Sequence, residues 1–183
     1  MFRFLDFSLA IVGLILSFPI LLIILFLGFF DTGSPIFIQE RVGMKKKPFK
    51  LIKFRTMSQS TASVASHLAS PSSITKFGAF LRKTKIDELP QLINVLKGEM
   101  SFVGPRPNLF NQDELIFARE AMDVYSVLPG ITGLAQINNI DMSNPLRLAE
   151  TDHKMIQSLT LKKYFEYIIR TATGSGTGDA VKP

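Results

Sequence analysis

The most apolar stretch of the chain lies near its amino terminus. Residues 9–30 read LAIVGLILSFPILLIILFLGFF and carry no charged side chain. This run is long enough for a helix that crosses the hydrocarbon layer of a bilayer. It is too long for a cleavable signal peptide, and no small-residue cleavage pattern follows it. The pattern predicts a membrane helix over residues 1–31, either an ordinary spanning anchor or a re-entrant helix that enters and leaves one leaflet.

Pro19 lies near the middle of this segment and favours the re-entrant alternative. A proline removes one intrahelical donor and clashes with the carbonyl a turn earlier, so we expect a kink. Ser17 is close enough to bond a carbonyl that the proline releases. Each half is too short to span a bilayer alone. The basic flank RVGMKKKPFKLIKFR is expected in the cytoplasm, and a sharp kink would leave both helix ends on that side.

An alternating pattern after the membrane segment predicts a short β-hairpin. The segments PIFIQERVG (35–43) and FKLIKFRTM (49–57) flank a turn-like MKKKP stretch. Side chains of a strand point alternately to its two faces. One face of the second strand should therefore carry two apolar side chains and two cations that could point toward a site: Phe49, Leu51, Lys53 and Arg55.

Two helices are predicted on either side of an adjacent carboxylate pair. Residues 75–85 (TKFGAFLRKTK) and 89–98 (LPQLINVLKG) have apolar positions at helical spacing. They meet at Asp87 and Glu88. Because Pro90 is compatible only with the first turn of the second helix, Asp87 should lie near its N-cap.

The remaining segments carry weaker patterns. Residues 58–73 are serine-rich without a clear period and predict a mobile loop. Residues 109–125 predict an amphipathic helix that either packs on the core or lies on the membrane. The glycine-rich end, 171–183, predicts a flexible tail. The catalytic domain is accordingly expected over residues 32–170.

Composition narrows the function classes. A chain of 183 residues with 46% hydrophobic content suits one domain. A net charge of +6 suits a nucleic acid, an anionic membrane surface or a phosphorylated substrate. The chain contains no cysteine, which excludes disulfides, thiolate catalysis and cysteine-bound zinc. His67 and His153 are isolated, and we interpret them as surface or packing residues because a metal site needs several convergent donors.

The carboxylate pair suggests phosphate chemistry. A helix N-terminus and neighbouring cations would keep Asp87 ionised. Two adjacent carboxylates suit Mg²⁺, which is usually held by one or two carboxylates together with substrate phosphates. Arg82 and Arg106, the latter between two prolines in SFVGPRP, could supply guanidinium groups for phosphates. The pattern indicates phosphoryl transfer, and the alternative is a solvated helix cap.

Longer motifs resemble a known family. The segments IQERVG, FKLIKFRTM, TKFGAFLRKTKIDELPQLINVLKGEMSFVGPRP and LPGITGLAQIN are similar to the bacterial sugar transferase family, the monotopic phosphoglycosyl transferases. The resemblance covers about residues 1–160. It implies an α/β, mostly helical, membrane-associated monotopic fold. Such a fold has a re-entrant helix broken at a proline, matching Pro19, a short β-hairpin and amphipathic helices at the membrane surface.

The resemblance also implies a reaction. The residue matching Asp87 attacks the β-phosphate of a UDP-sugar and expels UMP, and undecaprenyl phosphate then collects the sugar phosphate from the enzyme. Glu88 matches the residue associated with Mg²⁺, for which Mn²⁺ could substitute. Basic residues matching Arg55, Arg82 and Arg106 are associated with the phosphates, and Lys53 shares the strand face of Arg55.

The expected setting follows from the same resemblance. The donor would be a UDP-N-acetylhexosamine or a deoxy derivative. The reaction would begin the assembly of a bacterial surface glycan, such as an O-antigen or an exopolysaccharide, at the cytoplasmic face of the inner membrane. The sequence does not indicate an oligomeric state, and no nucleic acid is expected as a partner.

The chain departs from the family pattern at two places. Phe18 separates Ser17 from Pro19, whereas many members have Ser-Pro at the break. Many members continue after GLAQ into a Gly-Arg pair, but this chain reads INNIDMSNP, so donor recognition is expected to differ. The rival hypothesis is a membrane-anchored basic module that uses Lys45–Lys47 to bind anionic lipid or nucleic acid without catalysis.

Overall fold

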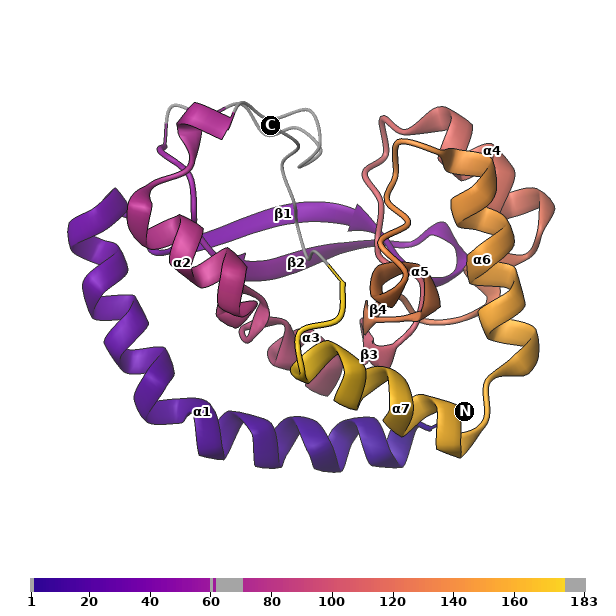
Figure 1. Ribbon diagram of the computed structural model, residues 1–183, viewed down its shortest axis with the longest axis horizontal. Helices are drawn as coiled ribbons and strands as arrows, with labels where there is room; N and C mark the ends of the chain where they lie inside the picture. Colours follow the sequence, from indigo (N-terminus) through magenta and orange to yellow (C-terminus); the bar gives the residue numbers. More distant parts are fainter. Residues whose placement is uncertain (1, 60, 62–70, 177–183) are drawn as a thin grey trace.

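Figure 1 shows the computed structural model, which describes residues 2–59, 61 and 71–176. A long helix borders a β-hairpin, two short helices below it, and a group of helices around a second, two-stranded sheet. The helices and strands are α1 (Arg3–Thr32), β1 (Ile36–Val42), β2 (Pro48–Phe54), α2 (Lys76–Thr84), α3 (Gln91–Lys97), β3 (Ser101–Val103), α4 (Asp113–Ala121), β4 (Gly130–Thr132), α5 (Leu134–Ile137), α6 (Pro145–Ser158) and α7 (Leu161–Ala172). The 3₁₀ turns are η1 (Met44–Lys46), η3 (Pro71–Ser73), η4 (Ile86–Glu88) and η5 (Val124–Ser126).

Helix α1 is bent within the apolar segment. Figure 1 shows one arm along the base of the molecule and the other along its left side. Pro19 lies inside the helix and leaves the carbonyl of Ile15 without its helical donor. Ser17 does not replace that donor, because its Oγ lies 3.5 Å from the carbonyl oxygen of Leu14. The expected serine contact is therefore weak and falls one residue away from the released carbonyl.

The amino-terminal end of α1 is joined to the rest of the molecule by a buried carboxylate. Asp6 is 2% exposed. Its Oδ1 accepts hydrogen bonds from Ser101 Oγ at 2.8 Å, the Phe102 amide at 2.9 Å and Tyr164 Oη at 2.7 Å. One side chain thus connects α1 to β3 and α7.

Both ends of α1 make further contacts with the same body. At the start, Arg3 donates to the carbonyl oxygens of Val95 and Leu96 at 2.6 and 3.0 Å, which lie in the last turn of α3. At the other end, Thr75 Oγ1 donates to Asp31 Oδ2 at 2.6 Å. The two ends of the apolar helix are therefore held by one folded domain.

The predicted hairpin is confirmed. Strands β1 and β2 pair antiparallel, with Gln39 opposite Leu51 and Phe37 opposite Lys53. The alternation in β2 holds from Pro48 to Lys53, because Phe49, Leu51 and Lys53 are buried while Pro48 and Lys50 are exposed, but Phe54 on the opposite face is buried as well. Arg55 lies one residue beyond the end of β2.

The two helices predicted around the carboxylate pair are present, but Asp87 is not at a helix cap. Pro90 is the N-cap of α3, and its side chain makes no cap hydrogen bond. Asp87 and Glu88 lie earlier, in the 3₁₀ turn η4. The prediction that Asp87 lies near the N-cap of α3 was wrong because a separate turn intervenes between the two helices.

Other boundaries differ from the sequence prediction. Helix α4 covers nine residues rather than residues 109–125, and its buried side chains include Leu115. Most of the predicted mobile loop, residues 60 and 62–70 with His67 among them, lies outside the described residues, as do residues 177–183. Helix α7 continues to Ala172, inside the predicted tail.

Candidate active site

The Asp87–Glu88 pair occupies a tight turn between α2 and α3. Helix α2 ends at Thr84, and its C-cap is Lys85, whose φ of 58° is left-handed. Turn η4 follows at once, and the Glu88 amide donates to Lys85 O at 3.2 Å. Asp87 is 2% exposed and Glu88 7%. Because burying ionised carboxylates is costly without compensating partners, this pair needs cations or hydrogen bonds beside it.

Arg106 supplies such a cation from the segment that follows β3. Its Nη2 lies 2.6 Å from Glu88 Oε1. The segment approaches the backbone before β4 very closely at Gly104, where an added Cβ would lie 2.4 Å from Leu128 O. A larger residue at that position would displace the loop, so Gly104 allows Arg106 to reach the pair. The predicted arginine is thus joined to the dyad through Glu88.

Lys85 is a second cation at the turn, and the sequence analysis did not assign it a role. Its Nζ donates to the carbonyl oxygens of Thr171, at 3.4 Å, and Ser175, which belong to the end of α7 and the segment after it. Burial lowers the pKa of the Lys85 ammonium from its ordinary value, and the nearby Glu88 carboxylate offsets part of this effect. Lys85 therefore adds a positive charge at the turn, and this charge is lost at lower pH than that of an ordinary lysine.

Arg82 is fixed beside the chain that leaves the hairpin. Its Nε donates to Thr56 Oγ1 at 2.8 Å. Helix α2 packs directly on that chain at Gly78, where an added Cβ would lie 2.1 Å from Thr56 O. Only a glycine permits this approach, so α2 and Arg82 are held close to the end of β2.

Lys53 and Arg55 gather on one aromatic ring. The Lys53 Nζ lies 5.7 Å and the Arg55 guanidinium carbon 5.3 Å from the centre of the Phe37 ring, which is within cation–π range. Arg55 also donates through Nε to Ser34 O at 2.8 Å. Strand β2 contacts η4, the turn that carries the dyad. Lys53 thus lies on the strand next to the dyad and Arg55 lies just beyond its end, whereas Arg106 contacts Glu88 of the dyad itself.

The site fits a magnesium ion only if the substrate supplies part of the ligands. Among the described residues there is no group of three or more acidic, histidine or cysteine side chains that could enclose a metal. Asp87 and Glu88 supply adjacent carboxylates, and Mg²⁺ commonly takes one or two carboxylates and completes its shell with water and substrate phosphates. The residues therefore fit an ion that arrives with a phosphorylated substrate, and Glu88 is the ligand that the sequence analysis predicts.

Comparison with known proteins identifies the family of the chain. The family model for the bacterial sugar transferase matches residues 1–176. The UDP-glucose:undecaprenyl-phosphate glucose-1-phosphate transferase of Caulobacter vibrioides is 35% identical over 160 residues, which are 81% of this chain and 59% of that protein. The enzyme of the same name from Escherichia coli K12 is 44% identical over 140 residues, 73% of this chain and 30% of that protein.

A third relative shows the same difference in length. An uncharacterized sugar transferase of Haemophilus influenzae is 41% identical over 160 residues, 76% of this chain but 34% of that protein. The chain thus spans about a third to three fifths of these relatives. The family model, in contrast, covers nearly the whole chain. The chain therefore belongs to the bacterial sugar transferase family.

Proposed function

We propose that the chain transfers a sugar 1-phosphate from a UDP-sugar to undecaprenyl phosphate and releases UMP. The observation that carries the proposal is the buried Asp87–Glu88 pair with the Arg106 guanidinium 2.6 Å from Glu88. Buried carboxylates beside cations suit phosphoryl transfer. The substrate classes come from the names of the Caulobacter vibrioides and Escherichia coli relatives.

Asp87 is the proposed nucleophile. Its carboxylate oxygen forms a bond to the β-phosphorus of the UDP-sugar, and the bond from that phosphorus to the bridging oxygen breaks, releasing UMP. An oxygen of undecaprenyl phosphate then forms a bond to the same phosphorus, and the Asp87 carboxylate leaves. Covalent catalysis allows one small site to treat a soluble donor and a lipid acceptor in turn.

The cations and Glu88 have supporting roles. Bound Mg²⁺ would spread the negative charge of the diphosphate and make UMP a better leaving group. Glu88 would hold the ion. The guanidinium of Arg106 would orient phosphate oxygens through its planar donors, and Arg55, Arg82 and Lys53 are the further cations proposed for the phosphates.

The membrane helix supports a reaction at the bilayer surface. Helix α1 is long and apolar enough to cross a membrane, and only a small part of it is buried. Both of its ends are hydrogen-bonded to the same domain, through Arg3 and Asp6 at one end and Asp31 at the other. This arrangement favours a helix that re-enters the cytoplasmic leaflet over one that spans the bilayer. It would place the dyad near the phosphate of a membrane-embedded acceptor.

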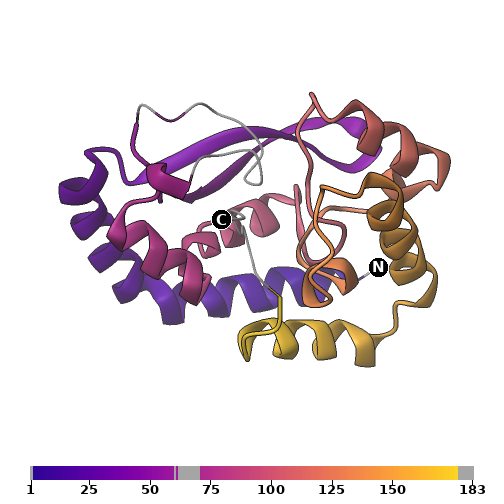
Figure 2. The same cartoon turned by 45° about the horizontal axis from the view of Figure 1, so that its top comes forward.

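Helix α7 offers a second membrane contact. Leu161, Phe165 and Ile169 are exposed at a spacing of four residues, while Tyr164 and Tyr167 are buried on another side of the helix. Figures 1 and 2 both show α7 beside the first arm of α1, and the Phe2 and Tyr164 rings lie 5.1 Å apart. The exposed stripe suits a helix that lies in the interface.

The test is turnover with a panel of donors. Purified protein receives UDP-glucose, UDP-galactose, UDP-N-acetylglucosamine or UDP-N-acetylgalactosamine, each with undecaprenyl phosphate and Mg²⁺, and UMP is measured. We expect one donor class to release UMP, with an N-acetylhexosamine donor as our proposal and glucose as the rival suggested by two relatives' names.

Asp87→Asn should be inactive. Asp113→Asn is the matched control, because Asp113 and Glu114 form another adjacent pair, exposed on α4.

Metal removal tests the role of Glu88. EDTA should abolish UMP release, and Mg²⁺ or Mn²⁺ should restore it. Full activity in excess chelator would remove the metal from the mechanism.

The rival binding module receives less support from the structure. Lys46, in the middle of the basic cluster Lys45–Lys47, forms an ion pair with Glu120 on α4, which reduces the free charge of the cluster. A pure binding module would bind anionic vesicles in a salt-dependent way without metal-dependent turnover.

A further inference from the structure

The backbone around Arg106 is held at four successive carbonyls. Each carbonyl oxygen from residue 105 to residue 108 accepts a hydrogen bond from a different donor. The pairs are Gly130 N to Pro105 O at 2.9 Å, Arg119 Nη1 to Arg106 O at 2.8 Å, Arg41 Nη1 to Pro107 O at 3.1 Å and Val42 N to Asn108 O at 2.9 Å. The donors belong to β4, α4 and β1. The loop that presents Arg106 is therefore fixed from three directions.

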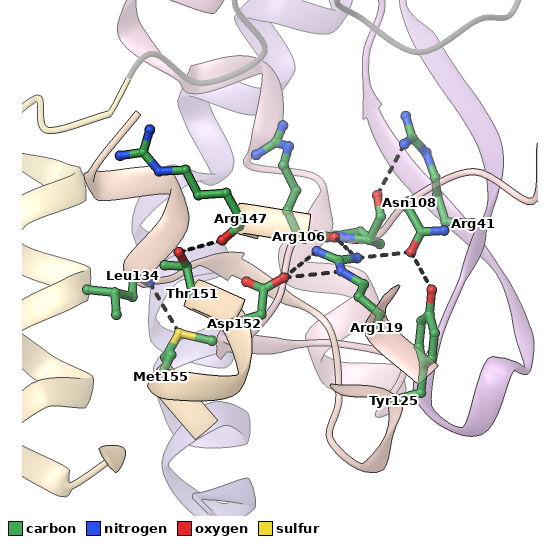
Figure 3. A network of polar contacts seen from close by, with 11 residues as sticks. Arg41, Arg106, Asn108, Arg119, Tyr125, Leu134, Arg147, Thr151, Asp152 and Met155 are labelled. Atoms are coloured by element: carbon green, nitrogen blue, oxygen red, sulfur yellow. Dashed lines mark hydrogen bonds and ion pairs between the residues drawn. The ribbon is translucent and has the colours of Figure 1, made fainter. Parts of the chain in front are cut away.

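Arg119 is the donor that holds Arg106 itself. Its side chain is 1% exposed, and its guanidinium contacts Asp152 Oδ2 on α6 through Nε at 3.1 Å and Nη2 at 2.6 Å. Its Nη1 donates both to Arg106 O and to Asn108 Oδ1, the latter at 2.9 Å. Figure 3 shows this guanidinium between Asp152 and the loop. Tyr125 Oη also donates to Asn108 Oδ1, at 3.0 Å.

The stability of the fold does not by itself explain this buried pair. Desolvating two charges offsets most of their attraction, and well-packed apolar residues often replace such pairs without loss. Asp152 is 0% exposed, and its Oδ1 is buried with no hydrogen-bond partner among the described residues. That oxygen adds a further cost. An apolar pair could join α4 to α6, but it could not donate to the carbonyl of Arg106.

We infer that Arg119, oriented by Asp152, is a positioning residue for the Arg106–Glu88 pair. Asp152 fixes the plane of the Arg119 guanidinium, and Arg119 fixes the peptide of Arg106. The Arg106 side chain then starts from a defined point and meets Glu88. The geometric part of this inference stands alone, while its effect on turnover rests on the proposed function.

Kinetics of three variants test the inference. Arg119→Lys keeps the charge, but an ammonium group cannot replace the planar guanidinium that donates to Asp152, Asn108 and Arg106 together. Asp152→Asn keeps the shape and removes the charge that orients Arg119. Leu148→Ala is the control for packing in the same interface, because Leu148 is buried on α6 one turn before Asp152 and belongs to an apolar cluster with Leu115 on α4. All three are measured at a temperature where each is folded, with the loss of melting temperature recorded.

The expected result is a loss of kcat beyond the loss of stability. A small displacement of a reacting group can cost a factor of about ten to a hundred in rate. We expect this loss for Arg119→Lys and Asp152→Asn, with the donor KM changed by less than roughly threefold, and nearly wild-type kcat for Leu148→Ala. Wild-type kcat in both network variants, or an equal loss in Leu148→Ala, would overturn the inference.

A second measurement does not need activity. A double-mutant cycle compares the melting temperatures of Arg119→Lys, Glu88→Gln and the double variant. Arg119 and Glu88 are connected through Arg106, whose carbonyl accepts from one and whose guanidinium binds the other. If Arg119 positions Arg106, the double variant should lose less than the sum of the single losses, by about 2 °C or more. Additive losses would contradict the inference even if the enzyme turns over, whereas an inactive wild type with coupled losses would reject the proposed function alone.

Discussion

Glu88 serves two partners in the proposed reaction. Its Oε1 lies 2.6 Å from Arg106 in the structure, while the mechanism also gives its carboxylate to a metal. A carboxylate has two oxygens and several acceptor positions, so it can bind an arginine and an ion together. The Arg106 side chain is 21% exposed, so part of it is accessible from solvent.

Replacing Arg106 by lysine should impair the enzyme despite the retained charge. A lysine ammonium cannot bind a carboxylate and a phosphate in one plane, so we expect kcat/KM to fall by about tenfold or more. The measurement is UMP release at varied donor concentration. Arg170→Lys is the control, because Arg170 pairs with Glu166 at 3.8 Å on an exposed face of α7. Wild-type kinetics for Arg106→Lys would assign Arg106 a purely structural role.

Lys85 should give the enzyme an early alkaline limit. Burial lowers the pKa of this ammonium, so its charge is lost at lower pH than that of an ordinary lysine. Turnover should then decline as pH rises through the folded-state pKa. The variant Lys85→Arg keeps its charge throughout this range, so it should extend activity to higher pH. The measurement is UMP release as a function of pH in the two proteins.

The stability of the protein should move in the opposite direction over the same range. Between the lowered folded-state pKa of Lys85 and its higher unfolded-state pKa, the unfolded chain binds more protons, so the contribution of Lys85 to stability rises with pH. For turnover, a pH profile that is identical in wild type and Lys85→Arg would contradict the prediction that Lys85 sets the alkaline limit.

At the scale of elements, the sequence predicted those parts whose pattern is local. The hairpin has alternating side chains, and α2 and α3 have helical spacing. Strands β3 and β4 have three residues each and pair in parallel from distant positions, so no local pattern reveals them. The turn that carries the dyad depends on Lys85 at positive φ, which lysine rarely adopts.

The sequence indicated the candidate site residues but not the side chains that hold them in place. Asp87, Glu88 and Arg106 were recognisable from a specific motif, and the structure joins Arg106 to Glu88. Arg119 was missed because a single arginine on an amphipathic helix is ordinarily a surface residue. Its burial depends on Asp152, which lies on another helix and gives no signal near Arg119 in the sequence.

Tyr164→Phe should loosen the connection of α7 to α1. The change removes one of three donors to Asp6 Oδ1 and leaves a buried acceptor less satisfied. We expect the free energy of unfolding to fall by about 1 kcal/mol or more. Tyr167→Phe is the matched control, because Tyr167 is buried on the same helix while the α7 hydroxyl that donates to Asp6 is that of Tyr164. Equal losses in the two variants, measured by denaturant unfolding in detergent, would show that the Asp6 contact contributes nothing specific.

At the scale of the whole molecule, the domain contacts both ends of its own apolar helix α1. Figure 2 shows the first arm of α1 below the body, with α7 beside it, and the second arm rising along the left side. The bond from Arg3 to α3 would have to break if the helix crossed the bilayer, because the domain follows the other end of the helix, where Asp31 is bonded to Thr75. The proposed topology thus follows from contacts at both helix ends as well as from Pro19.

Labelling in cells should find both ends of α1 on the cytoplasmic side. The chain has no cysteine, so single cysteines can be placed in a short amino-terminal extension and at Lys47, which is exposed. Both should resist a membrane-impermeant maleimide in intact spheroplasts and react after lysis. Pro19→Ala should shift some molecules toward a spanning helix. Labelling of the amino-terminal cysteine in intact cells would show that the wild-type helix spans the bilayer.

The covalent step is tested most directly by the mass of the intact protein. Wild-type protein is incubated with Mg²⁺ and the donor that supports UMP release, without undecaprenyl phosphate. The account predicts a mass increase of one sugar phosphate, which disappears when undecaprenyl phosphate is added and which peptide mapping assigns to Asp87. Asp113→Asn should gain the same mass, and Asp87→Asn should gain none and keep less than roughly a hundredth of the wild-type rate. Product formation without any adduct, or an undiminished adduct on Asp87→Asn, would contradict Asp87 as the nucleophile.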